Sequence, residues 1–238
     1  MQEWLVARAR SDPRVTGGAL IGSLAAEGAD RWSDLDLTFG VVAGVRPEAL
    51  LDEWTAAVRQ EWGLVHYWDL PFRTSLYRVW LLPSGLEADV SATPAPDFGA
   101  RGPRFQLLFG TAQPGEHTPP LDAQDLIGRG WHHVLHAHSA LERGQPWRAE
   151  YWISGVRDQT LALACLRRGV GAREGRGIDQ LPAAETDLLR DTLVRSLDDA
   201  ELWRALGAAA VCLLQEVEHW DAELGARLRP ILHAFTAR

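Results

Sequence analysis

The chain has 238 residues, of which 46% are hydrophobic, and its formal net charge is −8. This length suits one large or two modest domains with a sizeable core. The acidic balance argues against a long nucleic acid as partner, because neutralisation of phosphates by basic side chains dominates such affinity, and the absence of any apolar run of about eighteen residues argues against a membrane-spanning helix.

The first segments predict a short helix over residues 2–10 and a strand over 18–25 that runs into a turn at Gly22 and Ser23. Glycine suits such a turn because it has no Cβ atom, so the backbone can approach a ligand closely. A Gly-Ser turn of this kind is compatible with a polyphosphate ligand.

After ten intervening residues, the strand predicted over 34–42 begins with Asp34 and Asp36. Residues two apart on a strand point to the same face, so these carboxylates project together while Leu35 and Leu37 face a core. Two such carboxylates suit divalent cations, since Mg²⁺ usually takes one or two carboxylates together with phosphate oxygens. Taken alone, alternating acids are also typical of an exposed surface strand.

The rest of the N-terminal half predicts one helix and several more strands. Apolar residues at helical spacing mark the helix, and alternating or β-rich runs between turn residues mark the strands. The helix covers 48–62, the strands cover 64–70, 75–82, 86–91 and 104–110, and a loop covers 92–103.

The strands over 75–82 and 86–91 form a predicted hairpin, because a Pro-Ser-Gly turn joins them. Alternation along the second strand places Glu87 and Asp89 on its polar face, and Asp89 stands between two small apolar residues. An acid in this position is also compatible with a solvent-facing role.

These features together resemble the signature of the polymerase-β-like nucleotidyltransferases, in which a Gly-Ser pair, a spacer of similar length and an Asp-x-Asp motif follow one another. Ser33 directly before the first aspartate also fits this signature. The resemblance implies a third carboxylate on a neighbouring strand. Asp89 matches it best, and Glu87 is the reserve candidate.

The same resemblance implies a two-metal site. Asp34 and Asp36 are expected to bridge two Mg²⁺ ions, and Asp89 is expected to complete the site of the ion that activates an acceptor hydroxyl. Gly22 and Ser23, with Ser33 nearby, are assigned to nucleotide binding. The implied reaction is in-line transfer of a nucleoside monophosphate with release of pyrophosphate.

From about residue 121 the pattern changes to helices, after a Pro/Gly-rich boundary at 113–120. The predicted fold class is therefore α/β (α+β), with a nucleotidyltransferase mixed-sheet domain over 1–118 and a helical substrate-binding or lid domain over 119–238. Period-3.6 patterning predicts helices over 122–143, 146–168, 182–197, 199–220 and 221–235, with a glycine-rich connector at 169–181. This layout resembles the antibiotic nucleotidyltransferases that modify aminoglycosides or lincosamides, whose helical domain supplies acceptor-binding residues.

One stretch of the helical half carries candidate site residues. Glu150, Ser154, Arg157 and Asp158 fall near one face of the predicted second helix of this half. A carboxylate such as Glu150 is expected to act as general base for the acceptor hydroxyl. The chain has no lysine, so any protein cation that contacts phosphate is an arginine, and Arg157 is the candidate. The alternative is a helix face linked by ion pairs at i,i+4 and i,i+7 spacing.

Two further features indicate a cytoplasmic protein. Cys165 and Cys212 are isolated and lack C-x-x-C spacing, as reduced structural cysteines do. The first ten residues include an acid and two arginines, so they do not predict a signal peptide.

The sequence therefore predicts an Mg²⁺-dependent enzyme that moves a nucleoside monophosphate, AMP from ATP, onto a hydroxyl of a small molecule such as an aminoglycoside or lincosamide. Long nucleic acids and membranes are not expected partners. Two alternatives stay open. One is transfer of AMP to a partner protein, as in antitoxin-type minimal nucleotidyltransferases, and the other is a non-catalytic module that senses nucleotides.

Overall fold

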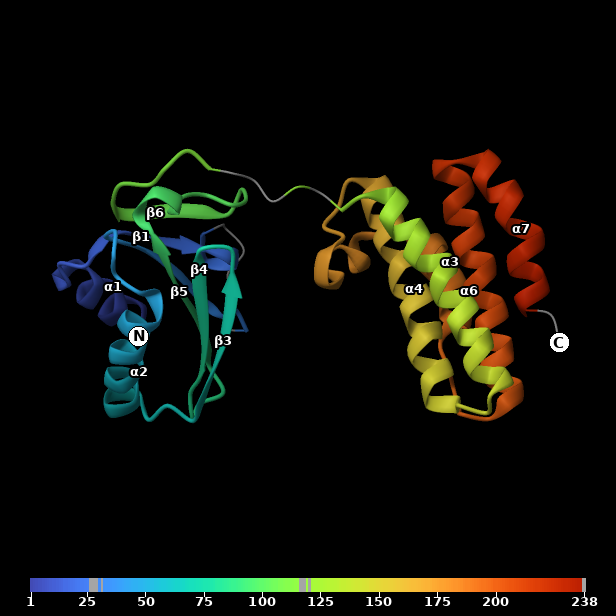
Figure 1. Cartoon of the computed structure of the whole chain (residues 1–238), viewed down its shortest axis with the longest axis horizontal. Coiled ribbons are helices and arrows are strands. Elements are labelled where there is room, and N and C mark those ends of the chain that lie inside the picture. The colour runs from blue at the N-terminus through green and yellow to red at the C-terminus, as the bar shows by residue number, and fades with distance from the viewer. Residues whose placement is uncertain (26–29, 31, 116–118, 120, 237–238) are drawn as a thin grey trace. The chain divides into compact units, whose positions relative to one another are not determined.

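A computed structural model describes residues 1–25, 30, 32–115, 119 and 121–236. The chain divides into two units, Met1–Pro119 and Pro120–Arg238, each with its own hydrophobic core. Strands occupy the first unit and helices the second (Figure 1). The predicted fold class, a mixed sheet followed by a helical bundle, is confirmed.

The described residues of the first unit form a six-stranded sheet with the order β3-β4-β5-β2-β1-β6. β2 and β5 pair in parallel, and all other neighbours pair antiparallel. The strands are β1 (Val15–Ile21), β2 (Leu35–Val41), β3 (His66–Phe72), β4 (Ser75–Leu81), β5 (Glu87–Pro94) and β6 (Phe105–Gly110). Each predicted strand is present, with ends shifted by up to four residues.

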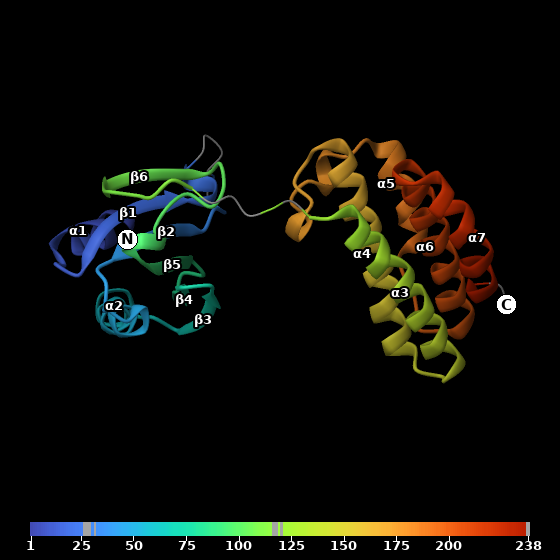
Figure 2. The ribbon, with the colours of Figure 1, turned by 45° about the horizontal axis from the view of Figure 1, so that its top comes forward.

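Helices α1 (Gln2–Ser11) and α2 (Pro47–Trp62) pack on one face of this sheet (Figure 2). The alternating residues Leu37 and Phe39 of β2 are fully buried there, and the Phe39 ring meets the ring of Trp54 edge-on at 5.0 Å. Because successive strand residues point to opposite faces, this packing leaves Asp36 and Thr38, which alternate with them, on the other face.

A buried arginine also joins α2 to the sheet. Arg78 of β4 is 2% exposed, and its guanidinium donates to Asp52 at 2.8 Å, to Thr55 at 3.0 Å and to Asp69 at 2.6 Å. Its Cζ atom also lies 4.3 Å from the centroid of the Tyr67 ring. A buried charge needs partners of this kind, since desolvation is costly.

The segment between β5 and β6 crosses the face opposite the helices. It includes the short 3₁₀ helix η2 (Ala95–Asp97) and the buried Phe98. A Cβ atom on Gly17 or Gly40, which pair across β1 and β2, would lie within 2.9 Å of the Phe98 ring. The two glycines therefore provide the space in which Phe98 fixes this segment to the sheet.

The second unit is a helical bundle around one core. Its helices are α3 (Ala123–Glu142), α4 (Pro146–Arg168), α5 (Ala183–Leu189), α6 (Asp199–Trp220) and α7 (Ala222–Thr236). The side chains of α3, α4 and α6 supply most of the buried core, and α7 packs on α6 and α3. The predicted connector at 169–181 contains two 3₁₀ turns, η3 (Arg173–Gly175) and η4 (Ile178–Gln180).

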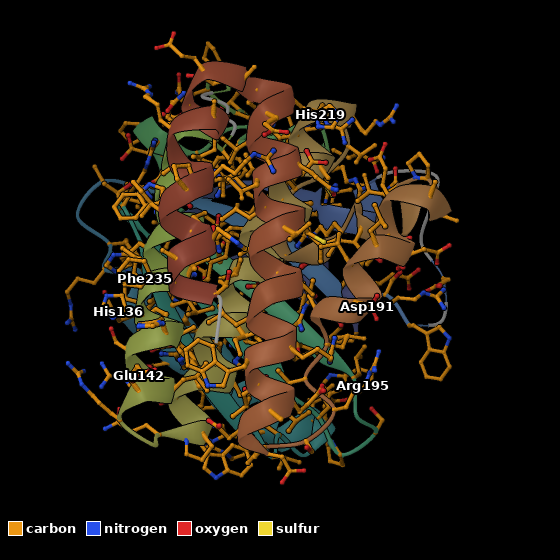
Figure 3. The ribbon with its side chains drawn as sticks, turned by 90° about the vertical axis from the view of Figure 1, so that its right-hand side faces the viewer. His136, Glu142, Asp191, Arg195, His219 and Phe235 are labelled. Carbon is orange, nitrogen blue, oxygen red and sulfur yellow. The ribbon has the colours of Figure 1, made fainter. Side chains whose placement is uncertain are left out.

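The helix predicted over 182–197 is wrong in its second half. α5 ends at Leu189 and is followed by the 3₁₀ turn η5 (Arg190–Thr192). The guanidinium of Arg204 donates to the backbone carbonyls of Asp191 (2.6 Å) and Leu193 (3.0 Å), so tertiary bonds satisfy groups that a longer helix would pair internally. Asp191 forms an ion pair with Arg195 at 3.0 Å beside this turn (Figure 3).

In the parts of the chain that the structure describes, no helix combines the length and the apolar character needed to cross a membrane.

Candidate active site

Two of the predicted carboxylates lie side by side on the sheet face opposite the helices. Asp36 of β2 is the direct partner of Asp89 of β5 in the parallel ladder. Neighbouring strands are about 4.8 Å apart, so both carboxylates project into one small region. Asp34 stands just before β2 and is exposed, and Glu87 is the first residue of β5 and is also exposed.

Asp89 is the carboxylate with the strongest electrostatic perturbation. Burial raises its pKa from 3.8 to about 7, and the nearby charges of Asp36, Glu87 and Asp34 add to this rise. Its Oδ1 atom is buried and has no hydrogen-bond partner among the residues that the structure describes. A buried oxygen in this state is costly unless a proton or a cation satisfies it.

The Gly22 position is shaped by Asp36. Gly22 begins the 3₁₀ helix η1 (Gly22–Ala25) with a φ of +68°. A Cβ atom at this position would lie 2.1 Å from Oδ2 of Asp36. Only glycine fits both the backbone angle and the contact, so the first turn of η1, which includes Ser23, lies directly beside the carboxylate.

Ser33 has a local role in the structure. Its hydroxyl accepts from the backbone N–H of Asp30 at 3.0 Å and donates to the carboxylate of Asp30 at 3.3 Å. The same carboxylate accepts from the backbone N–H of Trp32 at 2.8 Å. These bonds hold the backbone of the segment that directly precedes Asp34. The assignment of Ser33 to nucleotide binding stays a prediction.

The carboxylate pair fits a divalent cation. Among the described residues, no group of three or more Asp, Glu, His or Cys side chains is arranged to hold a metal ion by itself. Mg²⁺ does not require such a group, because it usually takes one or two carboxylates and completes its shell with phosphate oxygens and water. The unsatisfied Oδ1 of Asp89, next to Asp36, is the observation that favours a cation here.

Polar side chains continue from this pair along the same face. Two residues beyond Asp36 and Asp89 along their strands, the hydroxyl of Ser91 donates to that of Thr38 at 2.8 Å. Tyr77 of β4 is the ladder partner of Ser91, and burial raises the pKa of its hydroxyl while the charge of Arg101 opposes that rise. The open face is therefore polar well beyond the carboxylates.

Arg101 and Tyr77 belong to this face but were not among the predicted site residues. The β-rich run over 75–82 located Tyr77 on a strand, but a strand pattern does not reveal which strands are neighbours. Arg101 lies in a loop, and loops carry no periodic signal that places their side chains.

The two candidates in the helical unit have partners on their own helix. Glu150 accepts a hydrogen bond from the Ser154 hydroxyl at 2.7 Å, and Arg157 lies 3.9 Å from Asp158. The first contact is a hydrogen bond at i,i+4 spacing and the second joins adjacent residues, so neither is one of the ion pairs of the alternative interpretation. The roles of Glu150 as general base and of Arg157 as phosphate contact stay predictions.

The chain resembles two solved structures. A crystal structure of an aminoglycoside 6-adenyltransferase from Bacillus subtilis aligns with 100% of this chain and 98% of its own, at 13% identity and a TM-score of 0.44. A nucleotidyltransferase-like protein from Exiguobacterium sibiricum 255-15 aligns with 96% of this chain and 78% of its own, at 11% identity and a TM-score of 0.37. No protein-family model and no curated protein matches the chain.

Proposed function

We propose that this chain is an Mg²⁺-dependent nucleotidyltransferase that moves a nucleoside monophosphate, AMP from ATP, onto a hydroxyl of a small molecule. One observation carries the proposal: Asp36 and Asp89 pair directly on parallel strands, and the Gly22 turn lies against the carboxylate of Asp36. The Gly-Ser turn therefore lies next to Asp36 of the motif, although ten residues separate Ser23 from Asp34 in the sequence.

Asp36 and Asp89, with Asp34 beside them, are the residues that would hold the cations. When bound, two Mg²⁺ ions would lower the pKa of the attacking hydroxyl and neutralise charge on the phosphoryl group and the leaving oxygen. In the absence of a cation, the pKa of about 7 keeps the buried carboxyl of Asp89 mostly protonated below neutral pH. Cation binding is therefore expected to release that proton.

The turn at Gly22 is proposed to hold the triphosphate. Because glycine has no side chain, the backbone of this turn lies close to the Asp36 carboxylate, and the neighbouring Ser23 hydroxyl would be a further donor to the phosphates. During transfer, the acceptor oxygen forms a bond to the α-phosphorus, the bond from that phosphorus to the bridging oxygen breaks, and pyrophosphate leaves. The acceptor proton goes to a general base, for which Glu150 is the candidate.

Aminoglycosides and lincosamides are the acceptors to test first, because the sequence motif and the sheet-then-helices layout resemble the enzymes that modify them. The experiment is a screen in which the full chain, Mg²⁺ and each nucleoside triphosphate are incubated with a panel of these compounds while pyrophosphate release is followed. Asp36→Asn is the inactive control, since it keeps the size of the side chain and removes its charge.

Glu87→Gln is the matched control on the same strand face. Glu87 is exposed at the start of β5, whereas Asp89 is partly buried beside Asp36. Turnover that is lost in Asp36→Asn and kept in Glu87→Gln supports the proposal. The proposal is contradicted if Asp36→Asn keeps more than about a tenth of the wild-type turnover. Such a variant would have lost less than about 1.4 kcal/mol of transition-state stabilisation.

A further inference from the structure

The sheet face that carries Asp36 and Asp89 also carries a fixed arginine. Arg101 belongs to the segment that crosses from β5 to β6, and its Nη2 donates to the Ser75 hydroxyl at 2.8 Å. Ser75 of β4 in turn lies 2.7 Å, oxygen to oxygen, from the Thr93 hydroxyl of β5. Two neighbouring strands therefore hold the guanidinium over the polar face.

Part of this guanidinium lacks a partner. Nη1 of Arg101 is buried, yet it makes no hydrogen bond to any residue that the structure describes. A buried donor on a charged group that stays unpaired is costly, more so than a neutral one. An acceptor atom supplied by a ligand would remove this cost.

Arg101 lines two cavities that share several of their lining residues. A cavity of about 240 Å³ is lined by Arg73, Asp97 and Arg101 among others, and a second of about 180 Å³ is lined by Asp97, Arg101 and Arg104 together with Thr38 and Tyr77 of the polar face. Among the described residues that line this space, three are arginines and one, Asp97, carries a carboxylate. The space is electropositive, unlike the carboxylate end of the same face.

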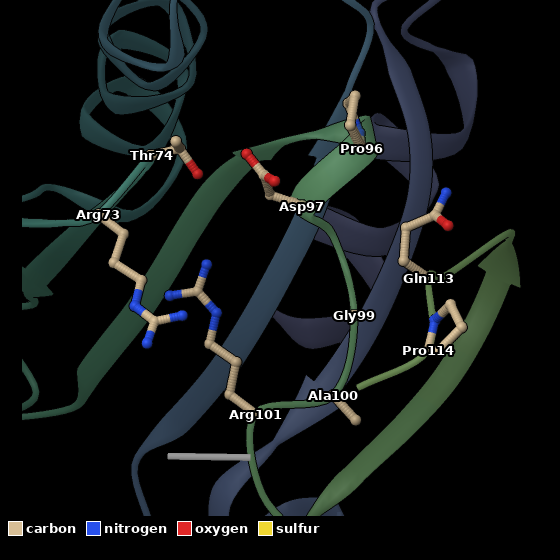
Figure 4. A pocket seen from close by; sticks show the side chains of 9 residues that line it. All are labelled: Arg73, Thr74, Pro96, Asp97, Gly99, Ala100, Arg101, Gln113 and Pro114. Atoms are coloured by element: carbon tan, nitrogen blue, oxygen red, sulfur yellow. The ribbon is translucent and has the colours of Figure 1, made fainter. Parts of the chain in front are cut away.

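Two of the arginines converge on one ring. The guanidinium carbons of Arg73 and Arg101 lie 5.7 and 5.2 Å from the centroid of Phe72. Figure 4 shows both side chains directed into the larger cavity, Arg73 from the β3–β4 turn and Arg101 from the crossing segment. Like charges gathered in this way repel one another, so an anion between them would be stabilising.

We propose that the Arg101 cavity binds a phosphate-type anionic group of the substrate. The planar guanidinium fork matches phosphate oxygens in a bidentate manner, and the chain has no lysine to serve instead. The inference rests on the proposed function in one respect, namely that the reacting group lies at Asp36 and Asp89 on the same face.

Two sources for the anion are consistent with this chemistry, the nucleotide and a phosphorylated acceptor. Thr93 is four residues beyond Asp89 along β5, which corresponds to roughly 13 Å. Gly22, the turn proposed for the triphosphate, lies instead against Asp36. This spacing favours the acceptor as the source of the anion, and such an acceptor is a phosphorylated small molecule rather than an unmodified aminoglycoside or lincosamide.

The test is a calorimetric titration of the full chain with inorganic pyrophosphate in EDTA, without divalent cation. We expect Arg101→Gln to weaken binding at least tenfold. Arg59→Gln, which changes an exposed arginine on α2 on the other side of the sheet, should stay within twofold of wild type. Arg73→Gln, a second variant in the same cavity, should also weaken binding, and this keeps the test decisive if Arg101→Gln does not fold. The proposal would be overturned if the folded Arg101→Gln and Arg73→Gln variants bound pyrophosphate with the affinity of the wild type, or if the wild type did not bind pyrophosphate.

A parallel titration with a non-hydrolysable nucleoside triphosphate and Mg²⁺ separates the two sources. If Arg101→Gln weakens the affinity for both ligands, the nucleotide supplies the anion. If it weakens only pyrophosphate binding, the acceptor supplies it. Because the metal-free titration requires no turnover, failure to find nucleotidyl transfer would count against the proposed function and leave this result unaffected.

Discussion

Substitution of Gly22 by alanine tests whether the turn and the carboxylate are built as one site. An added Cβ would lie 2.1 Å from Oδ2 of Asp36, whereas ordinary contacts begin at 3.4 Å. The carboxylate oxygen must therefore move by about 1 Å, and a displacement of that size in a reacting site can cost about 100-fold in rate. We expect kcat to fall by this factor, which corresponds to about 2.7 kcal/mol.

The same substitution also strains the backbone, so a matched control is needed. Gly63, the C-cap of α2, has a φ of +71° against +68° for Gly22, and a Cβ there would meet only Pro83 at 3.5 Å. Each alanine should cost about 1–2 kcal/mol of folding free energy through its left-handed conformation. Only Gly22→Ala should also displace the carboxylate.

The assay compares both variants by urea denaturation and by pyrophosphate release with the best substrate pair from the screen. Mn²⁺ binding in the presence of a non-hydrolysable nucleotide, followed by electron paramagnetic resonance, gives a second measure that does not depend on turnover. Equal turnover and equal Mn²⁺ affinity in folded Gly22→Ala and Gly63→Ala would refute the contact between turn and carboxylate.

Three further outcomes are expected. In metal-free protein, the raised pKa of Asp89 contributes stability that is fully present below pH 3.8 and lost as the pH rises to about 7. Asp89→Asn should remove this pH dependence in urea denaturation, and an unchanged slope would contradict the burial argument. Arg78→Met should lower the free energy of unfolding by about 2–3 kcal/mol, because it removes the partner of two carboxylates, and a change as small as that of an exposed arginine would contradict this reason. Glu150→Gln should lower kcat and leave nucleotide affinity unchanged if Glu150 is the base, with Ser154→Ala as control for their hydrogen bond. Normal turnover in Glu150→Gln would leave that residue a purely structural role on its helix.

The alternation of polar and apolar residues was sufficient to predict that Asp36 and Asp89 each point away from the apolar face of their own strand. In β2, Leu37 and Phe39 are buried while Asp36 faces away, and in β5, Ala88 and Val90 are buried on either side of Asp89. This information is local, because the period of a strand is two residues. The fold class followed in the same way from the change to helical spacing in the second half.

The pairing between distant segments was not predictable from these patterns. Nothing in either strand specifies that Asp36 stands opposite Asp89, since parallel register depends on the whole sheet. The contact between Gly22 and Asp36 depends on that register as well. The position of Arg101 depends on Phe98 filling the space above two glycines, and the early end of α5 depends on Arg204, so both result from tertiary contacts that override local preference.

In the proposed function, Asp36 and Asp89 form a site that transfers the α-phosphoryl group of a nucleotide. The most direct measurement supplies triphosphate labelled either at the α- or at the γ-position and follows the label into the acceptor, with wild type and Asp89→Asn compared under identical conditions. We expect α-label to enter the acceptor together with an equal amount of released pyrophosphate, and Asp89→Asn to abolish both. Transfer of γ-label, or α-label transfer that persists in Asp89→Asn, would contradict it.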